Sequence, residues 1–197
     1  MTDLEDWKKF TGEKILRELG INEDQKILDF GCGTGIYSII ASKIVGLKGR
    51  IFALDSDERD LVKDLLNEIE SKNITNIEFL KTSGEIEFPF KNQSIDVVLW
   101  FDVLHLLNKN QRKELIKESY RVLKLNGLIL YHATHRGMNN SISIENLSKE
   151  MKKNHLNLSL KLKKPMFHWA WIEDSIIYKF IKEEQTNSLN LGNDDCK

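Results

Sequence analysis

The chain has 197 residues, of which 41% are hydrophobic, and its 29 basic and 30 acidic side chains give a formal net charge of −1. That length suits one domain, and the hydrophobic content excludes a disordered protein. A near-zero net charge argues against a nucleic-acid partner, since such proteins usually carry a basic surplus. The two cysteines, Cys32 and Cys196, form no disulfide or metal-binding pattern, so we expect no metal and a cytoplasmic location.

Helical and strand patterns alternate through the first two thirds of the chain. Residues 4–19 have the spacing of an amphipathic helix and stop before Gly20, which fits a C-terminal cap. The expected strands are 26–30, 50–54, 77–80, 95–100 and 128–132, the last one after an Asn126-Gly127 turn, and the expected helices are 36–45, 58–71 and 109–122. This alternation predicts a parallel sheet with right-handed crossovers and helices on both faces.

The last third of the chain has a different pattern of apolar residues. We expect a helix over 144–154, a strand over 156–162 that Pro165 interrupts, and a strand over 175–181. Aromatic residues gather at 167–171, and we expect them to pack at the sheet edge rather than to cover a pocket. The predicted fold is a Rossmann-like three-layer α/β/α sandwich with a mostly parallel seven-stranded sheet whose last strand is antiparallel.

The domain boundaries follow from composition. Residues 1–182 are expected to form a single domain, and the polar stretch 183–197 is expected to be a disordered tail. The start of the chain has no apolar signal-peptide core, and no apolar run reaches the roughly 18 residues of a membrane span. The sequence leaves the choice between monomer and homodimer open.

A glycine-rich turn follows the first expected strand, in the segment Leu28-Asp29-Phe30-Gly31-Cys32-Gly33-Thr34-Gly35. Glycine lets the backbone turn tightly and lie against a ligand, and the next helix directs its N–H groups there. A dinucleotide site would need glycine at position 36, which is Ile36. Asp29 would repel a pyrophosphate but can pair, directly or through water, with an ammonium such as that of S-adenosylmethionine.

An acidic residue, Asp55, ends the second strand, 20 residues after Gly35. A carboxylate there can accept hydrogen bonds from both hydroxyls of a ribose. The alternative interpretation is that Asp55 caps the helix that follows. Together with the glycine turn, we favour ribose binding.

Between residues 26 and 133, the chain resembles the class I S-adenosylmethionine-dependent methyltransferases, in particular the broad ubiquinone/menaquinone-biosynthesis group. The residues that carry the resemblance are the glycine motif, Asp55, Phe88-Pro89-Phe90 with the segment 92–98, and the segment 121–128. The resemblance implies S-adenosylmethionine as cofactor and an N-terminal helix, 1–20, that covers it. The cofactor-binding residues that it implies are Asp29, Gly31, Cys32, Gly33, Gly35, Asp55, Ser56, Gly84, Glu85 and Phe101. Gly84 stands where the family often has an adenine-binding Asp, so Ser83, Glu85 or backbone groups would have to replace that contact.

Candidate catalytic residues follow the fourth strand, and candidate substrate residues lie at and after the end of the fifth. Asp102 and His105 are three residues apart, so both can share one helix face and act as a general base with its carboxylate partner. The alternative is a capping Asp and a structural His. His132, His135 and Arg136 follow the fifth strand, where the resembling family meets its substrate; the alternative is a solvated loop.

The predicted function is therefore methyl transfer to a small-molecule acceptor, since the chain has neither a basic surplus nor an additional domain to grip a large substrate. A protein or nucleic-acid methyltransferase and a non-catalytic S-adenosylmethionine-binding module remain as alternatives. Ile36 disfavours a nicotinamide oxidoreductase.

Overall fold

Seven strands form one sheet, in the order β3-β2-β1-β4-β5-β7-β6, in a computed structural model that describes residues 4–56, 60–134 and 142–184. All neighbouring pairs from β3 to β5 are parallel, whereas β7 runs antiparallel to both β5 and β6. The predicted mostly parallel sheet with an antiparallel last strand is thus confirmed. The strands are β1 (Lys26–Phe30), β2 (Arg50–Asp55), β3 (Ile77–Lys81), β4 (Ile95–Phe101), β5 (Leu123–Ala133), β6 (Leu156–His168) and β7 (Trp171–Lys182).

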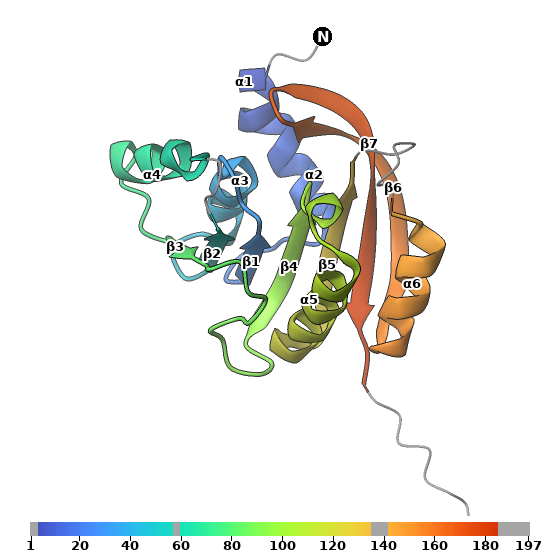
Figure 1. Ribbon diagram of the computed structural model, residues 1–197. Helices are drawn as coiled ribbons and strands as arrows, with labels where there is room; N and C mark the ends of the chain where they lie inside the picture. The colour runs from blue at the N-terminus through green and yellow to red at the C-terminus, as the bar shows by residue number, and fades with distance from the viewer. Residues whose placement is uncertain (1–3, 57–59, 135–141, 185–197) are drawn as a thin grey trace, which may run out of the picture.

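Helices cover both faces of this sheet (Figure 1). The helical elements are α1 (Leu4–Asp6), η1 (Trp7–Thr11), α2 (Gly12–Leu19), α3 (Ile36–Val45), α4 (Val62–Ser71), η2 (Leu104–Leu106), α5 (Lys109–Val122) and α6 (Ile144–Lys153). One core packs η1, α2, α3 and Leu65 of α4 against the sheet, and a second core packs α5 and α6 against its other face. These two cores confirm the three-layer sandwich. None of the helices in the described part of the chain has the length and hydropathy that crossing a membrane requires.

Two local expectations were wrong. Pro165 does not interrupt β6 but lies within it, opposite Asp174 of β7. Because β6 is the edge strand, its outer side needs no ladder hydrogen bonds, and a proline is tolerated there. Asn126 and Gly127 likewise lie inside β5, where Asn126 has a left-handed φ of 62° and the pairing with β4 shifts register. Of the predicted disordered tail, residues 185–197 lie outside the described part of the chain.

Lys182, at the end of β7, is a buried cation that holds the end of α5. Its Nζ donates to the carbonyl oxygens of Tyr120 (2.8 Å) and Leu123 (2.7 Å) and lies 4.2 Å from the centre of the Tyr120 ring. Helix C-termini leave carbonyl groups without intrahelical partners, so this contact satisfies groups that would otherwise be buried unpaired.

We expect Lys182→Met to lower the free energy of unfolding by about 2 kcal/mol or more, because it removes two charge-assisted hydrogen bonds and leaves buried carbonyls unpaired. Urea unfolding measures this loss. Lys163→Met is the matched control: Lys163 is exposed on the neighbouring strand and pairs with Asp174, so its loss should cost less than about 0.5 kcal/mol. Equal losses in both variants would contradict the proposed anchoring.

Candidate functional site

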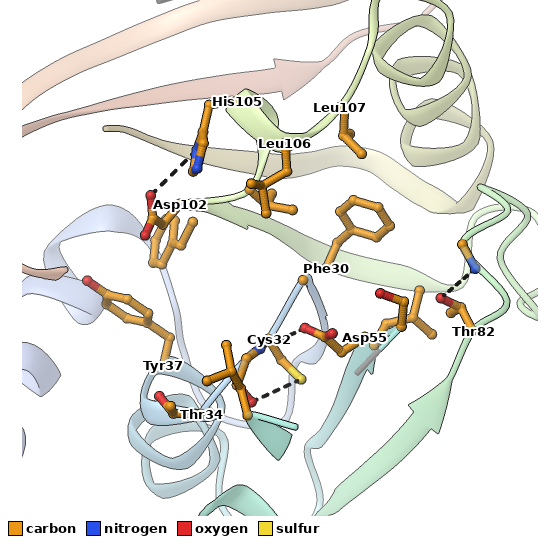
Figure 2. Close-up of a pocket in the computed structure, with 18 of the residues that line it drawn as sticks. Phe30, Cys32, Thr34, Tyr37, Asp55, Thr82, Asp102, His105, Leu106 and Leu107 are labelled. Carbon is orange, nitrogen blue, oxygen red and sulfur yellow. Dashed lines mark hydrogen bonds and ion pairs between the residues drawn. The ribbon is translucent and has the colours of Figure 1, made fainter. Parts of the chain in front are cut away.

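A cavity of about 410 Å³ lies at the carboxyl ends of β1, β2 and β4. The chain order reverses between β1 and β4, and open α/β sheets bind ligands at such a switch point. The site residues predicted from sequence that line this cavity are Gly31, Cys32, Gly33, Asp55, Ser56, Gly84, Glu85, Phe101, Asp102 and His105. In Figure 2, Asp55 and Thr82 lie on one side of the cavity, and Asp102, His105 and Tyr37 lie on the other.

The turn after β1 requires glycine at two positions, where a Cβ would meet different neighbours. Gly31 has a φ of 73°, and a Cβ on it would lie 2.5 Å from Val103. Gly35 also has a φ of 73°, and a Cβ there would lie 2.5 Å from the Leu65 side chain of α4. Gly35 does not line the cavity, so the structure places it in the packing of α3 against α4.

Asp29 lies behind this turn rather than in the cavity wall. Its side chain is buried, it accepts a hydrogen bond from Ser38 Oγ at 2.6 Å, and it is not among the lining residues. Burial raises the pKa of Asp29 to about 6. The hydrogen bonds from Ser38 lower this pKa, and the nearby charge of Asp55 raises it by a smaller amount. Pairing with a ligand ammonium remains a prediction, and it would need a bridging water or a shift of the turn.

The raised pKa of Asp29 makes stability depend on pH. The folded chain holds this proton more tightly than the unfolded chain, so its contribution is complete below about pH 4 and lost as pH rises through about 6. We expect Asp29→Asn, which cannot ionise, to gain about 2–3 kcal/mol relative to wild type between pH 4 and pH 7. Urea unfolding of both proteins at the two pH values measures this difference. Parallel pH dependence of the two would show that Asp29 titrates normally.

The Asp55 side of the cavity combines a carboxylate with an apolar wall. Asp55 Oδ2 accepts a hydrogen bond from the Gly33 N–H at 2.9 Å, which ties the end of β2 to the glycine turn. Leu61 and Ile86 line the cavity on this side, together with the polar segment that includes Thr82 and Glu85. A carboxylate for sugar hydroxyls beside apolar surface for a ring fits a nucleoside, and the volume lies within the range of small-molecule sites.

Asp102 and His105 form the polar part of the opposite side. His105 Nδ1 lies 3.6 Å from Asp102 Oδ1, and both side chains are largely buried (Figure 2). Asp102 has a left-handed φ of 54°, a conformation that non-glycine residues adopt mostly under local constraint. Phe101 lines the cavity beside them and packs edge-on against Tyr37, with ring centres 4.6 Å apart.

Of the three predicted substrate residues, the described part of the chain includes only His132. His132 is fully buried beneath Phe101 and does not line the cavity. Burial, with a smaller contribution from the charge of His168, lowers the pKa of His132 to about 3, so its ring is neutral at pH 7. His135 and Arg136 lie outside the described residues.

Sequence reasoning missed Tyr37 and Gln111 among the other lining residues. In the sequence, Tyr37 looks like one more apolar residue of helix α3. In the structure, its hydroxyl donates to the Phe167 carbonyl at 2.7 Å. The expectation that the aromatic run 167–171 only packs the sheet edge was half right. Phe167 packs against Trp7, yet both Phe167 and Trp169 line the cavity. Conversely, no residue of the helical segment 4–19 lines it, so a covering role for that segment remains a prediction.

Comparisons with known proteins agree with this geometry. A family model described as a methyltransferase domain matches residues 27–127. The chain is 33% identical to an uncharacterized protein of Haemophilus influenzae over 113 residues, which are 57% of this chain and 44% of that protein. It is 30% identical to the demethylmenaquinone methyltransferase of Staphylococcus aureus over 127 residues, covering 63% of this chain and 47% of that enzyme. The chain thus matches slightly less than half the length of these relatives.

Solved structures share the fold. A SAM-dependent methyltransferase from Aquifex aeolicus superposes with a TM-score of 0.73 at 21% identity, covering 92% of this chain and 94% of that one. The PH0226 protein from Pyrococcus horikoshii gives a TM-score of 0.70 at 15% identity, with 92% of each chain covered. With the family model spanning half of the chain over the glycine turn and the switch point, the chain belongs to the methyltransferase-domain family, the class I S-adenosylmethionine-dependent methyltransferases.

Proposed function

We propose that this chain transfers the methyl group of S-adenosylmethionine to a small-molecule acceptor. The observation that carries the proposal is one cavity whose wall contains both Asp55 with the glycine turn and the Asp102–His105 pair. The relative from Staphylococcus aureus is named for demethylmenaquinone, a small molecule, which supports this acceptor class. The net charge of −1 gives no general attraction to a nucleic acid.

The residues on the Asp55 side would hold the cofactor. Asp55 would bind the ribose hydroxyls, the turn from Gly31 to Gly33 would lie against the amino-acid end, and the segment containing Gly84 and Glu85 would border the adenine. When bound, the cofactor supplies a methyl group already activated on a positively charged sulfur. The protein's remaining work is to align the acceptor, exclude water and take a proton.

His105 is the proposed general base. Its Nδ1 faces Asp102, so its Nε2 would take the proton of the acceptor's O–H or N–H. Asp102 would stabilise the imidazolium that forms. Tyr37 is no rival base, because burial, helped by the charge of Asp102, raises the pKa of its phenol well above the usual value.

Calorimetry with S-adenosylhomocysteine, and with NAD as comparison, tests cofactor binding. We expect saturable binding of S-adenosylhomocysteine and none of NAD; the reverse pattern would overturn the assignment. Transfer of labelled methyl groups is then measured with a panel of small phenols and amines, a peptide mixture and an RNA. Labelling of a small molecule supports the proposed acceptor class, labelling of the peptides or RNA alone contradicts it, and cofactor binding without any labelling points to a non-catalytic module.

A further inference from the structure

The β6–β7 hairpin brings a second imidazole and a second carboxylate to Asp102. His168, the last residue of β6, has its Nε2 at 3.2 Å from Asp102 Oδ2 and its Nδ1 at 3.1 Å from Glu173 Oε1. The other oxygen of Asp102 faces His105 at 3.6 Å. Glu173, His168, Asp102 and His105 therefore form a row in which carboxylates and imidazoles alternate, from the hairpin to the cavity.

The far end of this row is itself held in place. Trp171 Nε1 donates to Glu173 Oε2, and Ser175 Oγ donates to Glu173 Oε1, each at 3.3 Å. Burial would raise the pKa of Glu173, but the hydrogen bonds from Trp171 and His168 and the charge of His168 bring it below the usual value. Glu173 is therefore an anchored anion beside the buried His168 ring.

Two other titratable groups near the row, both among the described residues, are neutral. Tyr37 of α3 stays protonated and neutral because its pKa is raised, and His132 of β5, with its ring centre 6.4 Å from that of His168, stays neutral because its pKa is lowered. Each ring nitrogen of His168 thus lies within 3.2 Å of a carboxylate oxygen.

We infer that His168 and Glu173 are positioning residues for the proposed base. Glu173 orients the His168 ring, His168 holds Asp102 Oδ2, and Asp102 Oδ1 is thereby kept toward His105 Nδ1. This arrangement keeps the proton of neutral His105 on Nδ1 and leaves Nε2 to face the acceptor. The left-handed backbone at Asp102 is consistent with a side chain fixed from both sides. The inference rests on the proposed function for its catalytic meaning, but its geometry is tested separately.

Nitrogen-15 NMR of the histidine rings in the full chain tests the inference without any acceptor. In wild type we expect neutral His105 at pH 8 to be a single Nδ1–H tautomer. In Glu173→Gln, the ring-nitrogen signals of His168 should shift, because its Nδ1 then faces an amide instead of a carboxylate. His105 should then relax toward a mixture of tautomers, because Asp102 is no longer held. Ser175→Ala removes only one donor to Glu173. The His168 and His105 signals should therefore move from their wild-type values toward those of Glu173→Gln, but less far.

Asp174→Asn is the matched control, since Asp174 neighbours Glu173 but pairs with exposed Lys163. Its His105 and His168 signals should equal those of wild type. Identical signals in wild type, Glu173→Gln and Ser175→Ala would overturn the inference, whether or not S-adenosylhomocysteine binds. Failure of wild type to bind S-adenosylhomocysteine would instead reject the proposed function. If an acceptor is found, Glu173→Gln should lower kcat about tenfold with KM unchanged, since only the orientation of the base is lost.

Discussion

Asp55→Asn is expected to weaken binding of S-adenosylhomocysteine by about 100-fold or more. An ionised carboxylate that accepts from both ribose hydroxyls makes two charge-assisted hydrogen bonds, each contributing about 1.5–3 kcal/mol. The amide keeps the size of the side chain and an oxygen for the Gly33 N–H, but it loses the charge and one acceptor. Calorimetry at fixed ionic strength measures the change in Kd.

The control for Asp55 is Asp64→Asn, an exposed acid on α4 that does not line the cavity. Its Kd should remain within about twofold of wild type, as is usual for exposed sites. Near-wild-type affinity in Asp55→Asn would mean that Asp55 only ties the end of β2 to the turn. A fall in melting temperature as large as that of a core variant would assign the effect to folding, so thermal unfolding of both variants accompanies the binding measurement.

His105→Gln should lower kcat by about 100-fold or more while leaving the affinity for S-adenosylhomocysteine within about threefold. General-base catalysis contributes roughly 10²–10⁴ in rate, and the amide cannot take up a proton at neutral pH. The split between turnover and cofactor binding separates a base from a residue that shapes the cofactor site. It is measured with an acceptor that wild type labels.

His155→Gln serves as the control for this variant, because His155 packs beside Tyr120 away from the cavity. Its kcat should be unchanged. If His105→Gln retained wild-type turnover, methyl transfer would need no base from this residue, as for an acceptor that is already ionised. For an acceptor that loses its proton to solvent at high pH, the base is needed less as the pH rises. The fall in kcat caused by His105→Gln should therefore become smaller with rising pH.

Local sequence determined much of this protein. The alternation of short apolar runs with helical patterns predicted the sheet and both helical layers, because burial on both faces imposes continuous hydrophobic strands. The bounds of β1, α3 and α5 agree with the structure residue by residue. The glycine turn and Asp55 were recognisable because a tight turn and a strand-end carboxylate each leave a signature in adjacent residues.

Contacts between distant segments were decided only by the tertiary structure. Pro165 reads as a break until β6 is known to be the sheet edge, and Asp29 reads as a residue of the cavity wall until Ser38 and the turn are seen to bury it. His168 and Glu173 lie more than 60 residues from Asp102, and they reach it because β7 pairs antiparallel with β5 and folds the hairpin back to the cavity. Periodicity records which face of an element is buried, but which side chains then meet depends on strand order and register, which only the folded sheet fixes.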